Sequence, residues 1–264
     1  MTRYDTIEEV KKHDSEAKTF DEVLKYNPYH GYHGYFSTAS GATSVSGSDR
    51  KQRISAAQDR IKGALKEGAR VELSAMDPDL AERTADVVQK VMEKYPDMKD
   101  SINSFTCKDE HYWLRNEQLV GSFDPDDKTV RLNPATFGDR GYAEEAWKNM
   151  LERKYHPEGT PVEAAAAHEM GHAFDLQISQ QLFGVSPREF RNGNSMSQRI
   201  AEKEASGLTE AEVEVRLSGY ATRNAAEMFA EGFSEYITSS KPRPMAKQLG
   251  EAFESYREQM NGGE

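Results

Sequence analysis

The sequence predicts an α+β fold that is predominantly helical and contains a small sheet. Helical periodicity runs through residues 53–69 and again through residues 78–95, whereas residues 102–107 and 119–132 have the composition of strands. From residue 142 onward helical patterns prevail. A chain of 264 residues can bury a core large enough to fold without disulfides.

Composition excludes several classes of protein. The net charge of −11 disfavours binding to nucleic acid, which depends on clustered Lys and Arg. No apolar run approaches the roughly 20 residues of a membrane-spanning helix, and the charged N-terminus lacks the apolar core of a secretory signal. We therefore expect a protein that binds no membrane and is cytoplasmic, or released without a Sec signal. The oligomeric state is left open.

Residues 1–49 are expected to form an N-terminal arm or linker, followed by one domain over residues 50–264. Residues 27–49 are rich in Gly, Ser, Thr and Tyr and poor in aliphatic side chains. His30 and His33 have a metal-binding spacing, but a surface loop is the simpler interpretation. The segment NPYHGYHGYF also resembles polar tails of phage head-associated proteins, which implies association with a phage or mobile element.

Two helices are expected to precede the first strand. The first places Ile54, Ala57 and Ile61 on one apolar face. The second begins with Asp77 as its N-cap and Pro78 at its first position, and it ends before a second proline at position 96.

The predicted sheet consists of a strand over residues 102–107 and a hairpin over residues 119–132, with its turn at residues 124–127. Cys107 ends the first of these strands. We interpret it as a buried thiol, although a cysteine that ligates and blocks a metal site is the alternative. Residues 128–132 are the candidate edge strand of the sheet.

The most informative segment is TPVEAAAAHEMGHAFDLQ, residues 160–177. Thr160, Pro161 and Glu163 together predict the start of a helix through a capping box. On that helix His168 and His172 lie one turn apart on the same face. They form the motif HExxH with Glu169 between them.

This spacing has a direct chemical interpretation. Zinc is bound by imidazole nitrogens, and a catalytic zinc keeps one position open for water. Glu169 is placed to act as the general base toward that water. The alternative is an exposed amphipathic helix with two unrelated histidines. The small residues at 164–167 argue against it, since they suit close packing and leave His168, Glu169 and His172 as polar exceptions.

A third metal ligand is expected downstream. The metzincin continuation is absent, because the residues that follow His172 supply no third histidine. Glu227 and Glu231 share one helical face and either could complete a site of two histidines and one glutamate. The alternative for Glu227 is a capping role three residues after Asn224. Asp175 is left unassigned.

The segments HEMGHAFD and SGYATRNAAEMFAEGF together resemble the catalytic domain of anthrax lethal factor and its relatives. The resemblance implies a zincin-like fold of the gluzincin type, with the sheet above the HExxH helix. It also implies a zinc ion held by His168, His172 and Glu227, with Glu169 as general base. Tyr220 would donate its hydroxyl to the developing oxyanion, and Glu231 would orient His168 from behind the metal.

The expected function is a zinc-dependent endopeptidase that acts on a protein or peptide substrate. Two alternatives stay open at the level of sequence. One is a catalytically silent zincin-fold binding or scaffold protein, for example in a phage particle. The other is a partner-binding module whose active part is the arm of residues 1–49, with the metal site stabilising the fold.

Overall fold

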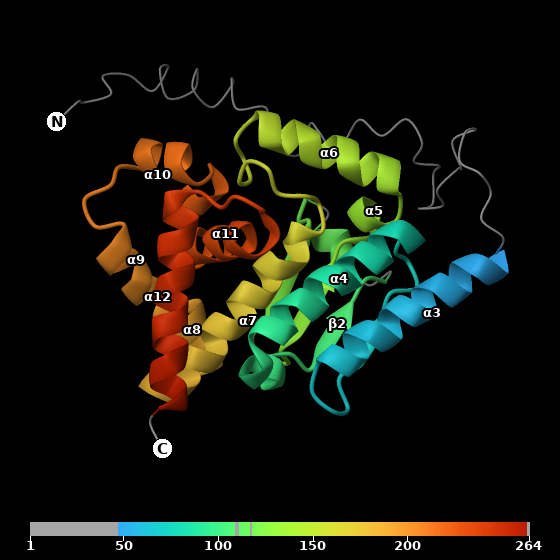
Figure 1. Ribbon diagram of the computed structural model, residues 1–264, viewed down its shortest axis with the longest axis horizontal. Coiled ribbons are helices and arrows are strands. Elements are labelled where there is room, and N and C mark those ends of the chain that lie inside the picture. Colours follow the sequence, from blue (N-terminus) through green and yellow to red (C-terminus); the bar gives the residue numbers. More distant parts are fainter. Residues whose placement is uncertain (1–46, 109–110, 117, 263–264) are drawn as a thin grey trace.

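The computed structural model describes residues 47–108, 111–116 and 118–262 (Figure 1). The predicted arm therefore lies almost wholly outside the described residues, as do His30 and His33. The described chain is an α+β structure, predominantly helical, with one small sheet. None of the described helices is long and apolar enough to cross a membrane.

The first two helices of the described residues form a pair, with α3 covering Gly47–Ala64 and α4 covering Pro78–Lys94 (Figure 1). Both were expected. Asp77 caps α4 as predicted, since its side chain accepts hydrogen bonds from the backbone N–H groups of Asp79 and Leu80. The Arg53 guanidinium on α3 contacts Asp79 and Glu82 on α4, so the pair is joined by charged as well as apolar contacts.

The prediction that two helices precede the first strand is wrong. Strand β1, Arg70–Glu72, lies between α3 and α4 and pairs in parallel with β2, Ser104–Thr106. Its three residues are too few and too polar to show an alternating pattern. The strand forms because β2, more than thirty positions away in the sequence, supplies its hydrogen-bond partners.

The sheet has four strands in the order β1-β2-β4-β3. Strand β3 is Gly121–Asp124 and β4 is Thr129–Leu132, and they form the predicted antiparallel hairpin. The prediction that residues 128–132 form the edge is wrong. Strand β4 also pairs in parallel with β2, so it lies inside the sheet and β3 becomes the edge.

Two short helical turns flank β2, namely η1 Pro96–Ser101 before it and η2 Trp113–Arg115 after it. Helices α5 Pro134–Phe137 and α6 Arg140–Glu152 connect β4 to the helix that carries the HExxH motif. The indole N–H of Trp147 on α6 donates to the carbonyl of Thr160, which fixes the segment leading into the next helix.

Helix α7 covers Ala164–Phe183 and carries the HExxH motif. The predicted capping box at its start is wrong. The carboxylate of Glu163 instead accepts hydrogen bonds from Nε and Nη2 of Arg83, and the hydroxyl of Thr160 donates to the carbonyl of Pro157. A bidentate ion pair with a guanidinium is stronger than a neutral cap. The helix therefore begins only after Glu163.

The chain ends in a helical layer around α7 (Figure 1). Its members are α8 Pro187–Arg191, α9 Met196–Glu204, α10 Glu210–Arg216, η3 Tyr220–Thr222, α11 Ala225–Thr238 and α12 Pro244–Asn261. Helix α11 crosses α7 closely, because Gly171 lets the Ala230 backbone approach. Beside that crossing, the rings of Tyr95, Phe174 and Phe253 form an aromatic cluster in the core.

Candidate metal centre

Helix α7 brings the two motif histidines together. Both lie one turn apart on the same face, and their Nε2 atoms are 3.2 Å from each other. The buried alanines at the start of α7 and the glycine between the histidines allow the helix to pack deep in the core. The polar motif thus directly follows a run of buried alanines.

Helix α11 supplies the third group. Oε2 of Glu227 lies 3.0 Å from Nε2 of His168 and 3.4 Å from Nε2 of His172. The backbone N–H of Glu227 donates to the Asn224 side chain, which caps α11. Both sequence interpretations of Glu227 therefore describe part of the structure: its backbone is capped, and its carboxylate meets the histidines.

These three residues can hold a metal ion. A tetrahedral centre with metal–ligand bonds of about 2.0–2.1 Å separates its ligand atoms by about 3.3–3.4 Å. The three distances between the candidate atoms are 3.0, 3.2 and 3.4 Å. Two imidazole nitrogens and one carboxylate oxygen thus lie nearly at the corners that such an ion requires. No other such group occurs among the described residues.

The charges in this cluster are strongly coupled. Burial by itself would raise the pKa of Glu227, but His172 and His168 outweigh it and hold that pKa far below its ordinary range. Burial opposes charging of the His168 ring, yet Glu227 and Glu231 raise its pKa well above its ordinary value. A metal ion at this position must therefore displace protons, so that binding of the ion releases them.

Glu231 lies behind His168, one turn after Glu227 on α11. Its Oε1 is 2.9 Å from Nδ1 of His168, and its Oε2 accepts a hydrogen bond of 2.7 Å from the hydroxyl of Ser218. Burial would raise the pKa of Glu231, but His156 and His168 lower it to about 2. A proton on Nδ1 of His168 leaves Nε2 with its lone pair toward the metal position.

Glu169 does not join the three metal-binding groups, and its carboxylate lies against the edge strand β3. A Cβ atom at Gly121 would lie 2.7 Å from Oε1 of Glu169. Burial raises the pKa of Glu169 to about 7, although His168 and His172 oppose the shift. A carboxyl group with such a pKa is an effective proton acceptor near neutral pH, and a nearby cation would lower this pKa.

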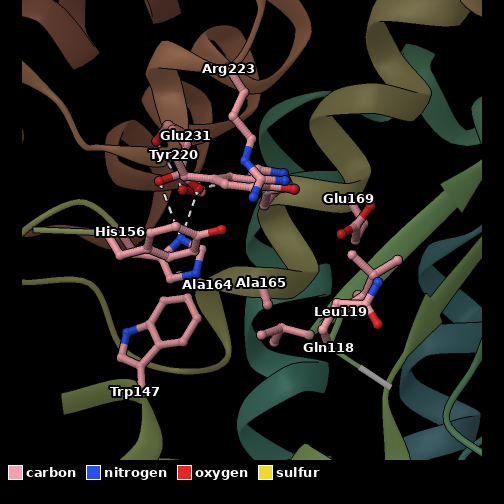
Figure 2. Close-up of a pocket in the computed structure, with 15 residues that line it drawn as sticks. Gln118, Leu119, Trp147, His156, Ala164, Ala165, Glu169, Tyr220, Arg223 and Glu231 are labelled. Atoms are coloured by element: carbon pink, nitrogen blue, oxygen red, sulfur yellow. Dashed lines mark hydrogen bonds and ion pairs between the residues drawn. The ribbon is translucent and has the colours of Figure 1, made fainter. Parts of the chain in front are cut away.

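A cavity of about 630 Å³, counting its open mouth, lies beside the candidate metal centre. In Figure 2, His156 and Trp147 lie on one side and Glu169 with Leu119 on the other. Tyr220 also lines it, with its ring 5.9 Å from the His168 ring. Burial raises the pKa of Tyr220, so its hydroxyl keeps its proton and remains a donor.

The remaining residues singled out in the sequence lie elsewhere. Cys107 is buried at the end of β2 and takes no part in the metal-binding group. Oδ1 of Asp175 is buried and accepts hydrogen bonds from the Ser179 hydroxyl and the Ser197 backbone N–H, so it links α7 to α9. Sequence reasoning missed Gly121 and His156, because no periodic or motif signal marks either one.

The sequence was compared with protein-family models and with curated proteins, and neither comparison found a match. The resemblance to the lethal factor catalytic domain therefore stays a prediction. What can be said of function comes from the geometry of His168, His172, Glu227 and Glu169.

Proposed function

We propose that the chain is a zinc-dependent endopeptidase with a zincin-like fold. The observation that carries the proposal is the convergence of His168, His172 and Glu227 at tetrahedral spacing, with Glu169 facing the adjacent cavity. Two histidines and a glutamate are a ligand set of catalytic zinc that leaves one position open. A bound zinc ion would make a coordinated water more acidic and would polarise the scissile carbonyl.

The chain's own groups have separate roles in this proposal. Glu169 accepts the proton of the attacking water and passes it to the leaving amine. Tyr220 donates its hydroxyl to the oxygen that becomes negative in the transition state, an interaction worth about 10²-fold or more in rate. Glu231 keeps the His168 ring oriented through Nδ1.

The edge strand supports a peptide as substrate. In an antiparallel pair of strands, every second residue forms its backbone hydrogen bonds with the neighbouring strand, and the residues between point theirs away from it. The backbone N–H of Asn133 donates to the carbonyl of Val120, so Val120 is one of the residues bonded to β4. The backbone groups of Gly121 and Phe123 therefore point away from β4. An extended peptide can pair with these groups, and Gly121 lies directly against Glu169.

The test is metal content followed by turnover. The purified full chain should contain about one zinc ion per molecule by elemental analysis, and His168→Ala and His172→Ala should each lose it. The zinc-loaded chain should cleave members of an unbiased peptide library, with products identified by mass spectrometry. Glu169→Gln should keep zinc and lose cleavage, because an amide does not accept the proton.

The result separates this proposal from its rivals. A silent zincin-fold scaffold would bind zinc and cleave nothing. A chain that binds no zinc at all would remove the central claim. Equal cleavage by Glu169→Gln and the unaltered chain would show that Glu169 is not the base.

A further inference from the structure

Arg223 stands over the ring of Tyr220, three residues before it in the chain. In a 3₁₀ turn such as η3, side chains at positions i and i+3 lie one above the other. The backbone of Arg223 continues that turn, with φ −64° and ψ −46°, and its N–H donates to the carbonyl of Tyr220. The central carbon of the guanidinium lies 4.7 Å from the centroid of the Tyr220 ring (Figure 2). The contact between the two side chains therefore follows from the local backbone.

The backbone of Tyr220 is fixed by the segment that follows α6. Its N–H donates to the carbonyl of Tyr155, and the N–H of Gly219 donates to the carbonyl of Lys154. These two bonds hold the start of η3 in place. The side-chain torsions of Tyr220 are then the freedom that decides where its hydroxyl stands.

The contacts that restrict those torsions are made by the ring of Tyr220. The ring centroids of Tyr155, His156 and His168 lie 5.2, 5.7 and 5.9 Å from its own. These three residues are buried or half-buried, whereas Arg223 is exposed, so its guanidinium covers the ring toward solvent. A guanidinium within about 6 Å of a ring centroid is attracted by the negative face of the ring. Arg223 thus completes the enclosure of the Tyr220 ring.

The charges around Tyr220 show where its hydroxyl lies. Burial raises the pKa of Tyr220 most, and the negative charges of Glu227 and Glu169 raise it further, whereas the charge of Arg223 lowers it. The hydroxyl is therefore close to the candidate metal centre. Arg223 also makes the hydroxyl a stronger hydrogen-bond donor, because a cation favours negative charge on the phenol.

We propose that Arg223 is a positioning residue whose guanidinium, packed over the Tyr220 ring, holds the Tyr220 hydroxyl where the oxyanion of the reaction forms. The inference rests on the proposed endopeptidase activity, in which Tyr220 is the hydroxyl donor. The rival role for an arginine that lines the cavity is direct contact with the substrate. Contact that is equal in the ground state and the transition state changes KM, whereas positioning of a group that acts only in the transition state changes kcat.

Steady-state kinetics of the zinc-loaded full chain with a cleaved peptide separate the two roles. Arg223→Met keeps a long side chain and removes the cation. It should lower kcat by about 5-fold, the worth of one cation–π contact at an exposed site, and leave KM unchanged. Arg223→Lys restores a cation above the ring and should recover most of the loss.

A second background shows whether Arg223 acts through the hydroxyl. Tyr220→Phe removes the hydroxyl and should cost about 10²-fold in kcat. Arg223→Met should then have no further effect on kcat, because no hydroxyl is left to position. An arginine that contacts the substrate directly would cost the same in both backgrounds.

Arg199→Met is the matched control. Arg199 on α9 stands over the Phe183 ring at 4.0 Å, and neither residue lines the cavity. The same substitution therefore removes the same kind of contact at a distance from Tyr220, and kcat should stay unchanged. Zinc content and circular dichroism check that each variant is folded.

The position of the Tyr220 side chain can also be measured without turnover. Three-bond NMR couplings of the full chain with labelled tyrosine report the χ1 angle, and the Tyr220 signal is the one absent from Tyr220→Phe. We expect a single staggered rotamer in the unaltered chain and in Arg223→Lys. In Arg223→Met the couplings should become averages over more than one rotamer.

The outcomes keep the two proposals apart. A Tyr220 rotamer that depends on Arg223, in a chain that cleaves no peptide, would overturn the proposed function and leave the positioning of Tyr220 intact. An unchanged rotamer in Arg223→Met would overturn the positioning role. So would a rise in KM at constant kcat, an equal loss of kcat in the Tyr220→Phe background, or an equal loss in Arg199→Met.

Discussion

Gly121 lies against Glu169 so closely that a Cβ atom at position 121 would stand 2.7 Å from Oε1 and 3.0 Å from Cγ of that glutamate. The same Cβ would be 3.2 Å from the carbonyl oxygen of Arg131, so it could not shift freely toward β4. The absence of a side chain at Gly121 therefore sets where the proposed general base stands. The edge strand thus positions Glu169 as well as offering backbone groups to a peptide.

Gly121→Ala should reduce kcat by about 10²-fold, because displacement of a catalytic group by about 1 Å has effects of that size. KM should change little, since the backbone groups at the edge are kept. Zinc content and thermal stability should also be kept, because Ala suits a strand better than Gly. Steady-state kinetics with a cleaved peptide provide the measurement.

The matched control for this substitution is Ser122→Ala, one residue further along β3. Its side chain points to the other face of the sheet, because successive side chains of a strand alternate. It should leave kcat unchanged. Equal losses in the two variants would mean that β3 acts through stability and that Gly121 does not position Glu169.

Glu227 and Glu231 should differ in what their removal costs. Glu227→Ala deletes one of three metal-binding groups and should lower zinc affinity severely, as measured by competition with a chelator. Glu231→Ala should lower it by only about 10- to 100-fold, because it acts through His168. It should also destabilise the fold, since Ser218, His156 and His168 lose their shared acceptor. The reverse order of zinc affinities would show that Glu231 is the ligand.

Gly232 on α11 should tolerate no side chain while Leu249 faces it from α12. A Cβ atom at Gly232 would lie 2.3 Å from Cδ1 and 3.1 Å from Cβ of Leu249. Leu249 is fully buried, so it has little room to move. Gly232→Ala should destabilise the protein by about 1–3 kcal/mol in urea unfolding.

Two comparisons check this assignment. In a Leu249→Ala background the additional cost of Gly232→Ala should largely disappear, because the opposing atoms are gone. Gly63→Ala on α3 meets nothing within 4 Å and should stabilise the helix instead. A cost for Gly232→Ala that is the same in both backgrounds would contradict the contact with Leu249.

The ion pair between Asp97 on η1 and Arg257 on α12 should make stability depend on pH in the acid range. Nε of Arg257 lies 2.8 and 2.7 Å from the two carboxylate oxygens. Burial would raise the pKa of Asp97, but Arg257 and Asn261 outweigh it and lower this pKa below its ordinary value of 3.8. The contribution is therefore present above pH 3.8 and is lost as the pH falls through the lower folded value.

A double-mutant cycle of Asp97→Asn and Arg257→Ala measures that contribution. The coupling free energy should be about 1 kcal/mol at pH 7, because the pair is partly exposed. It should be smaller at pH 2, because the carboxylate is protonated as the pH falls through its lowered pKa. Arg257 also stands over the Tyr95 ring, a contact that does not titrate here and that the cycle cancels. A coupling that is equal at both pH values would rule out the ion pair as its source.

Local patterns in the sequence determined the elements whose stabilising interactions are themselves local. The apolar spacing of Ile54, Ala57 and Ile61, the cap at Asp77 and the hairpin turn after Asp124 all act within a few residues of one another. A helix with His168 and His172 one turn apart must also bring them to the same face. The pairing of these two groups therefore followed from the sequence alone.

Only the tertiary structure decided the interactions that join distant segments. Strand β1 forms because β2 pairs with it, and Glu163 does not cap α7 because its carboxylate pairs with Arg83 of α4. The edge strand of the hairpin is β3 because β4 pairs with β2, and the hairpin sequence by itself does not specify that pairing. Gly121 and His156 acquire their roles only from the side chains that the fold places against them. No local periodicity carries such information, because the partners lie tens of residues apart and meet only when the core packs.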